Sequence, residues 1–129
     1  MWQAKDGSVK RILVVDDDPG LRDLMTVVLQ EQYIVSAASN GVEALDAMRH
    51  CPPDAVVLDM MTPVMDGWTF LRACRRTPLR ADVLVMVVSG EPTACRDGMQ
   101  LGAQACIQKP FDVQHLTAAV DQLFADNAH

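Results

Sequence analysis

The sequence predicts a doubly wound α/β domain, with helices on both faces of a five-stranded parallel sheet. Short apolar runs alternate five times along the chain with longer segments of helical periodicity. The runs are continuously apolar, as in strands that right-handed βαβ crossovers cover on both faces, whereas a half-exposed sheet would alternate apolar and polar residues. Half of the 129 residues are hydrophobic, which allows one domain to bury a sizeable core.

The first βα unit begins with the β-branched run Arg11–Val15, which acidic residues follow. Pro19 suits the first turn of the next helix, where its missing N–H costs nothing, and Asp18 is placed to cap that helix. The apolar residues of this helix recur at helical spacing and form its predicted inward face: Leu21, Leu24, Met25 and Val28.

The second unit has a predicted strand at Tyr33–Ala37 and a helix that begins at Asn40 and Gly41. The pair Pro52-Pro53 ends this helix, because proline cannot continue it. The residues predicted to face inward are Val42, Leu45 and Met48.

The third unit has a predicted strand at Ala55–Leu58, and Asp66-Gly67 forms the turn into a helix that runs from about Asp66 to Arg76. Phe70, Leu71 and Cys74 are its predicted inward residues.

The fourth unit has a predicted strand at Val83–Val88 and a weaker helix at Thr93–Leu101. Gly98 costs that helix about 1 kcal/mol relative to alanine, which suggests a mobile element. The fifth unit has a strand at Ala105–Gln108 and a helix at Val113–Phe124. The apolar residues of this last helix are Val113, Leu116, Val120 and Leu123. We expect residues 1–10 to be an N-terminal extension, 11–125 the domain and 126–129 a C-terminal tail.

Charge and hydropathy exclude several classes of protein. The net charge of −6 argues against direct contact with nucleic acid, which requires clustered Lys and Arg. The one basic group is predicted to be a solvated helix end, with a docking patch as the alternative: Arg72, Arg75, Arg76 and Arg80. Met1–Lys10 has no apolar export segment, and the strongly apolar run Val83–Val88 is too short to span a bilayer. We therefore expect a soluble, cytoplasmic protein without membrane insertion.

The four cysteines show no CxxC pair and no histidine at ligand spacing, so neither a zinc site nor a redox pair is indicated. We interpret Cys51, Cys74, Cys95 and Cys106 as reduced thiols. The histidines His50, His115 and His129 lie in helical or terminal positions that do not suit phosphotransfer.

Reactive side chains follow four of the predicted strands. Asp16-Asp17 follow the first strand, Asp59 the third, Ser89 the fourth and Lys109 the fifth. The carboxyl ends of parallel strands meet at one edge of a doubly wound sheet, so these groups should converge. Three carboxylates, a hydroxyl and an ammonium group are suited to binding a divalent cation and handling a phosphoryl group.

The segments that carry these groups resemble the receiver domain of two-component response regulators, and the resemblance extends from Arg11 to Phe124. Four motifs carry it: Ile12–Pro19, Leu58–Gly67, Val88–Gly90 and Lys109–Phe111. It implies the flavodoxin-like strand order 2-1-3-4-5 that chemotaxis receivers have. It also implies that a histidine kinase or a histidine phosphotransfer protein passes a phosphoryl group to one aspartate, as in phosphorelay signalling.

The resemblance assigns a role to each residue of the predicted site. Asp59 is the expected phosphoacceptor. Mg²⁺, with Mn²⁺ as an alternative, would be held by Asp17 directly, by Asp16 mainly through water, and by Asp59 and the backbone carbonyl of Met61. Lys109, which typically precedes a cis peptide bond in receivers, and Ser89 would bind the phosphoryl oxygens. The packed carboxylates should raise one another's pKa, so Mg²⁺ should stabilise the fold.

Ser89 and Cys106 occupy the positions at which receivers switch. Cys106, three residues before Lys109, replaces the usual aromatic residue that couples the site to the surface of the fourth helix, fifth strand and fifth helix. Switching must then proceed through backbone shifts after Asp59 and Ser89, or the domain acts as a phosphate carrier. Met61, two residues after Asp59, is a candidate for shielding the acyl phosphate from water.

Simpler interpretations exist for the individual motifs. The run Asp16–Asp18 could be an N-cap cluster, and Ser89-Gly90 an ordinary loop start. A different functional class, the Mg²⁺-dependent aspartyl-phosphate phosphatases, typically needs a second acid two residues after the nucleophile, where this chain has Met61. We therefore expect a signalling module and not an enzyme, either as a receiver alone or as the receiver part of a larger regulator or hybrid kinase.

Overall fold

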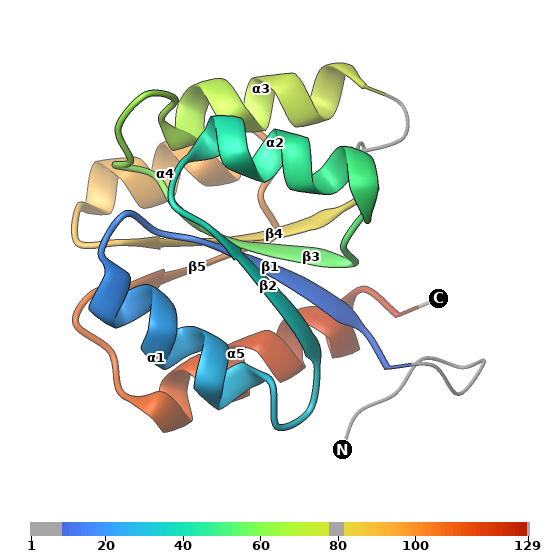
Figure 1. Cartoon of the computed structure of the whole chain (residues 1–129). Coiled ribbons are helices and arrows are strands. Elements are labelled where there is room, and N and C mark those ends of the chain that lie inside the picture. Colours follow the sequence, from blue (N-terminus) through green and yellow to red (C-terminus); the bar gives the residue numbers. More distant parts are fainter. Residues whose placement is uncertain (1–8, 78–81, 129) are drawn as a thin grey trace.

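The computed structural model describes residues 9–77 and 82–128, in which strands and helices alternate along the chain (Figure 1). The strands are β1 (Arg11–Val15), β2 (Ile34–Ala38), β3 (Ala55–Asp59), β4 (Leu84–Ser89) and β5 (Ala105–Gln108). The helices are α1 (Pro19–Leu29), α2 (Gly41–His50), α3 (Gly67–Arg76), α4 (Pro92–Gln100) and α5 (Val113–Asp126). Arg80, His129 and most of the predicted extension at 1–10 lie outside the described residues.

The strands form one parallel sheet in the order β2-β1-β3-β4-β5, which confirms the predicted fold class and strand order. Consecutive pairs along the sheet are in parallel register, for example Val14 with Val57 and Val57 with Met86. The chain order reverses between β1 and β3, so the crevice at their carboxyl ends is the topological switch point of the sheet.

Two hydrophobic cores lie on opposite faces of the sheet. Alternate residues of one strand serve both, because successive side chains of a strand point to opposite faces. Ile12 and Val14 belong to the core that α1 and α5 cover, whereas Leu13 and Val15 belong to the core beneath α2, α3 and α4 (Figure 1). The apolar runs are therefore continuous because helices cover both faces of the sheet, as predicted.

The edge strand β2 is the exception to this coverage. Ile34 is 46% exposed, and most of the other residues of β2 remain at least partly accessible. The predicted strand Tyr33–Ala37 is shifted by one residue, because Tyr33 turns inward before β2 begins. Its ring packs on Phe124 of α5, and its hydroxyl donates a hydrogen bond to Asp121. Tyr33 therefore belongs to the core beside α5 and is not part of β2.

Three residues predicted to face inward are exposed. Leu24 and Val42 are each 47% exposed, and Val113 is 41% exposed. The small residues Gly41 and Ala44 are buried at the corresponding part of α2, where Gly41 lies against Met65. A spacing of three or four residues identifies an apolar stripe, but the phase of the stripe at a helix end depends on neighbouring elements.

Gly98 has a packing role that the sequence did not indicate, while the mobility of its helix stays a prediction. A Cβ atom at this position would lie 2.6 Å from Cγ2 of Val87 on β4. The glycine allows α4 to approach the sheet closely, and it is buried there. The helix begins at Pro92, one residue before the predicted start, because proline is favourable in the first turn.

Arg75 binds the main chain at the end of α3. Its Nη1 donates to the carbonyl of Val83 at 3.1 Å, and its Nη2 donates to the carbonyl of Gly102 at 2.8 Å. These bonds hold the loops before β4 and before β5 together. At least this member of the basic group is therefore a structural connector.

Candidate functional site

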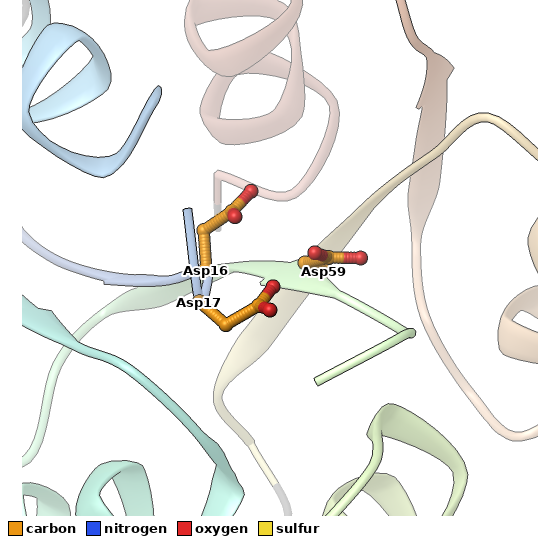
Figure 2. A group of neighbouring side chains, drawn as sticks. All are labelled: Asp16, Asp17 and Asp59. Carbon is orange, nitrogen blue, oxygen red and sulfur yellow. The ribbon is translucent and has the colours of Figure 1, made fainter. Parts of the chain in front are cut away.

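The reactive groups converge at the carboxyl edge of the sheet, as the sequence predicted. Asp16 and Asp17 directly follow β1, and Asp59 is the last residue of β3. One carboxylate oxygen from each of the three lies within 4.8 Å of the others (Figure 2). Lys109, which follows β5, places its Nζ 3.2 Å from Oδ2 of Asp16 and 3.4 Å from Oδ2 of Asp59.

Asp16 is fixed by the backbone around it and is fully buried. Its Oδ1 accepts a hydrogen bond from the N–H of Asp18 at 2.9 Å, and its carbonyl accepts one from Nη1 of Arg22 at 2.8 Å. Asp18 alone caps α1, because its Oδ1 accepts from the N–H groups of Gly20 and Leu21. The N-cap interpretation therefore holds for Asp18, whereas Asp16 points into the cluster.

The loop after β3 orients Asp59, which is 5% exposed. Its Oδ1 accepts a hydrogen bond from the N–H of Met61 at 3.0 Å, so Oδ2 is left to face Lys109. The carbonyl of Met60 accepts a bond from the N–H of Gly67 at 2.9 Å, which ties the residue after Asp59 to the start of α3. Both carboxylate oxygens of Asp59 are thus held in place.

The loop contains a further buried polar residue that the sequence reasoning did not select. Thr62 is 7% exposed, and its Oγ1 donates a hydrogen bond to the carbonyl of Met65 at 2.8 Å. This bond closes the turn in which Val64 adopts a φ of 70°, a left-handed conformation that is uncommon for a β-branched residue. No local sequence signal identifies this contact, because valine disfavours such a backbone conformation.

Burial and charge set the electrostatics of the cluster. Burial raises the pKa of Asp16, and the negative charge of Asp59 adds to this effect, while the Asp18 N–H and Lys109 oppose it. Burial lowers the pKa of Lys109, but the charges of Asp59 and Asp16 outweigh burial, so that its pKa is raised overall. Lys109 therefore pairs with two of the three clustered carboxylates, and the site keeps an excess of negative charge.

Ser89 lies at the end of β4 beside these groups and is 1% exposed. Its Oγ accepts a hydrogen bond from the N–H of Glu91 at 3.0 Å, and its carbonyl accepts one from the N–H of Lys109 at 2.9 Å. The Lys109–Pro110 peptide bond is cis, as the resemblance predicted. The hydrogen bond from the Lys109 N–H to the Ser89 carbonyl holds the ends of β4 and β5 together at the site.

The donor set fits a hard divalent cation such as Mg²⁺. All three side chains offer oxygen, which Mg²⁺ prefers, and the accessible Asp17 leaves room for the water ligands that this ion retains. The cluster contains no thiolate or imidazole of the kind that selects zinc. The backbone carbonyl of Met61 as a further ligand stays a prediction, as does shielding by the Met61 side chain, which is 60% exposed.

The interpretation of all four cysteines as reduced thiols is wrong for two of them. Cys95 of α4 and Cys106 of β5 form a disulfide, with their Cα atoms 5.7 Å apart, whereas Cys51 and Cys74 are not disulfide-bonded. The two partners are separated by 11 residues and match no cysteine motif, so spacing could not reveal the pair. The adjacency of α4 and β5 in the fold brings their sulfur atoms together.

Among the residues that the structure describes, no helix is both long and apolar enough to cross a bilayer.

Comparisons with known proteins find related sequences and structures. A family model described as the response regulator receiver domain matches residues 12–121. Sporulation initiation phosphotransferase F of Bacillus subtilis is 37% identical over 112 residues, which are 86% of this chain and 90% of that protein. The DNA-binding response regulator MtrA of Mycolicibacterium smegmatis is 37% identical over 116 residues, which are 86% of this chain and 49% of that protein. The chain thus spans about half the length of several DNA-binding regulators that it matches.

Solved structures show the same fold. A putative response regulator from Chloroflexus aurantiacus superposes with a TM-score of 0.84 at 31% identity, covering 90% of this chain and 98% of that one. A chemotaxis response regulator of Vibrio cholerae superposes with a TM-score of 0.85 at 27% identity, covering 90% of this chain and 99% of that one.

Proposed function

Because this chain belongs to the response regulator receiver domain family of two-component systems, we propose that Asp59 accepts a phosphoryl group in a Mg²⁺-dependent reaction. The donor is a phosphohistidine of a histidine kinase or of a histidine phosphotransfer protein. One observation carries the assignment to Asp59: this carboxylate lies in the acidic cluster, with an oxygen 3.4 Å from the ammonium group of Lys109.

The chemistry follows from the position of each group. An oxygen of Asp59 attacks phosphorus, an O–P bond forms, and the P–N bond to the donor histidine breaks. Anionic Asp59 repels the anionic phosphoryl group, and Lys109 offsets part of this repulsion. Bound Mg²⁺ would be held by Asp16, Asp17 and Asp59, and it supplies positive charge that stabilises the transferring group.

Ser89 is positioned to bind the transferred group. Its hydroxyl accepts a hydrogen bond from the Glu91 N–H, which leaves its own proton available for donation to a phosphoryl oxygen. Lys109 would pair with another phosphoryl oxygen as a point charge. Ser89 ends β4 and Lys109 follows the neighbouring strand β5, so both side chains can contact the same ligand.

We propose that the chain is a phosphoacceptor without enzymatic turnover of its own beyond slow loss of the phosphoryl group. The residue two positions after Asp59 is Met61, which has no acidic group to activate water. The protein then acts by changing its contacts with other proteins, and its kinase-type donor suggests a cytoplasmic site of action.

As a second candidate, we propose that this chain is the receiver part of a larger regulator or hybrid kinase, in which a separate domain produces the output. Several matched relatives, among them the DNA-binding response regulator MtrA, are about twice as long as this chain. In such proteins the receiver would control an attached domain. The phosphoacceptor chemistry is the same in both cases.

Incubation with Mg²⁺ and acetyl phosphate tests the proposed reaction. We expect the intact mass to rise by one phosphoryl group and to remain unchanged when EDTA is present, because the acidic site needs a cation. A mass increase that is independent of Mg²⁺ would contradict the proposed site. If no adduct is seen, binding of beryllofluoride distinguishes a short-lived adduct from a site that cannot hold a phosphoryl group.

Metal binding is expected to stabilise the folded protein. Millimolar Mg²⁺ should raise the Tm, because a ligand that binds only the folded state adds about 1.4 kcal/mol at ten times its Kd. Asp17→Asn, which removes one carboxylate of the cluster, should reduce this shift in a thermal melt. Asp46→Asn, at an exposed position on α2, should retain the full shift. An unchanged Tm in wild-type protein would argue against an intact metal site.

A further inference from the structure

The disulfide between Cys95 and Cys106 joins α4 to the sheet immediately behind the proposed phosphoryl site. Cys106 lies three residues before Lys109 and pairs in register with Val87 of β4. Gly98 of α4 packs against the same valine. The disulfide therefore reinforces the contact between α4 and the strands that end in Ser89 and Lys109.

A short series of contacts connects the disulfide to the hydroxyl of Ser89. Glu91 is the N-cap of α4, and its N–H donates to Ser89 Oγ at 3.0 Å. The N–H of Cys95 donates to the carbonyl of Glu91 at 3.3 Å across the first turn of α4. A covalent bond at Cys95 thus restrains the turn that holds the Ser89 hydroxyl.

We propose that Cys95 and Cys106 are a reversible thiol–disulfide pair that reacts with low-molecular-weight disulfides of the glutathione class and controls how readily Ser89 engages a phosphoryl group. The second part rests on the proposed function. The oxidised pair keeps the start of α4 on β5 and the Ser89 hydroxyl on the Glu91 N–H. The reduced pair lets the first turn of α4 follow Ser89 toward a bound phosphoryl group.

The pair is accessible to such a reagent. Both cysteines are only partly buried, so their sulfur atoms are not enclosed in the core. The two cysteines outside the disulfide differ from the pair, because Cys74 is buried and Cys51 is exposed at the end of α2. Partial exposure together with a neighbouring second thiol is the arrangement found in redox-responsive pairs.

The redox step balances with oxidised glutathione as the electron acceptor. One protein thiolate attacks a glutathione sulfur, which forms a mixed disulfide and releases one glutathione thiolate. The second protein thiolate attacks the protein sulfur of the mixed disulfide, which forms the Cys95–Cys106 bond and releases the second thiolate. Two protein thiols lose two electrons and two protons, and the glutathione disulfide is reduced to two thiols.

Alkylation in defined glutathione buffers tests the pair. After equilibration and acid quenching, unfolded protein is treated with N-ethylmaleimide and its mass is measured. We expect all four cysteines to be labelled in reducing buffer, whereas in oxidising buffer only Cys51 and Cys74 should carry either a label or a glutathione adduct. Cys51→Ser should lose one label and keep the transition. Labelling of all four thiols in fully oxidising buffer would overturn the proposal, as would a pair that no reducing buffer opens.

Beryllofluoride affinity, measured by calorimetry with Mg²⁺, tests the coupling to Ser89. We expect the oxidised protein to bind at least about fivefold more weakly than the reduced protein, the lower end of typical coupling between sites. The double variant Cys95→Ser/Cys106→Ser should bind like the reduced protein in both buffers. Equal affinities of the two wild-type states would overturn the coupling.

A second readout reports α4 directly. Trp68 of α3 donates a hydrogen bond from Nε1 to Oδ2 of Asp97, two residues after Cys95, at 3.0 Å. In a Trp2→Phe background, the fluorescence of Trp68 should change on beryllofluoride binding more in the reduced than in the oxidised protein. An absence of binding in both states would overturn the proposed function and the coupling, while the labelling experiment would still decide the thiol pair.

Discussion

Asp59→Asn is expected to abolish phosphoryl acceptance while the protein stays folded. Asparagine lacks the anionic oxygen that attacks phosphorus, so incubation with acetyl phosphate and Mg²⁺ should give no mass increase. The amide oxygen of asparagine can still accept the Met61 N–H bond, which is 3.0 Å long in the wild type. Lys109 keeps its ion pair with Asp16, so the substitution leaves no unpaired ammonium group. We expect the free energy of unfolding, measured in urea, to change by about 1 kcal/mol or less, which is the contribution of one hydrogen bond.

Asp18→Asn is the matched control for this substitution. Asp18 lies at the same edge of the sheet, but its side chain caps α1, a role that asparagine fills equally well. This variant should accept the phosphoryl group like the wild type. If the Asp59→Asn protein still gained one phosphoryl group on a carboxylate, the acceptor would be another residue. If both variants lost the reaction, the effect would lie in the loop structure and not in the nucleophile.

Gly67→Ala is expected to lower the free energy of unfolding by about 3 kcal/mol, the upper part of the range for overpacking a well-packed site. A Cβ atom at Gly67 would lie 2.6 Å from the Cα atom of Met60 and would also overlap its sulfur. The clash is with the main chain, which a change of rotamer cannot relieve. Met60 is fully buried and follows Asp59, so relief of the clash would also displace the proposed phosphoacceptor.

The Gly67→Ala prediction has a clear control in Gly90→Ala. An added Cβ atom at Gly90 meets no atom within 4 Å, and its φ is not in the left-handed region. The free energy of unfolding of this variant, measured in urea, should match that of the wild type to within about 0.5 kcal/mol, as for other substitutions away from packed sites. A Gly67→Ala protein of wild-type stability would show that α3 can move away from Met60 at little cost. It would then also be expected to retain phosphoryl acceptance.

The two proposals together give a physical account of signalling without an aromatic residue at position 106. The sequence left two possibilities, backbone shifts after Asp59 and Ser89 or a carrier that switches weakly. The hydrogen bond from the Glu91 N–H to Ser89 and the disulfide at Cys95 both restrain the backbone at the start of α4. The redox state of the cysteine pair would then select between the two possibilities. In our proposal, the reduced protein behaves as a switch, and the oxidised protein behaves more like a carrier.

Local sequence patterns determined the fold class and the residues of the site. Strand length, helical spacing and the proline and glycine positions depend on near neighbours, so they could be identified without the structure. The sites at Asp16, Asp59, Ser89 and Lys109 follow from the same information, because a polar residue after a buried parallel strand must lie at the carboxyl edge of the sheet.

Tertiary structure alone decided what depends on contacts between distant segments. It paired Cys95 with Cys106, which spacing had not indicated, and it gave Gly98 a packing role against Val87. It left Leu24, Val42 and Val113 exposed, although each lies at an apolar position of its helix. A periodic pattern specifies which residues share a face, but the depth and phase of that face are set by the elements that pack on it. For that reason the position of the acidic cluster was predictable from the sequence, and the disulfide that joins α4 to β5 was not.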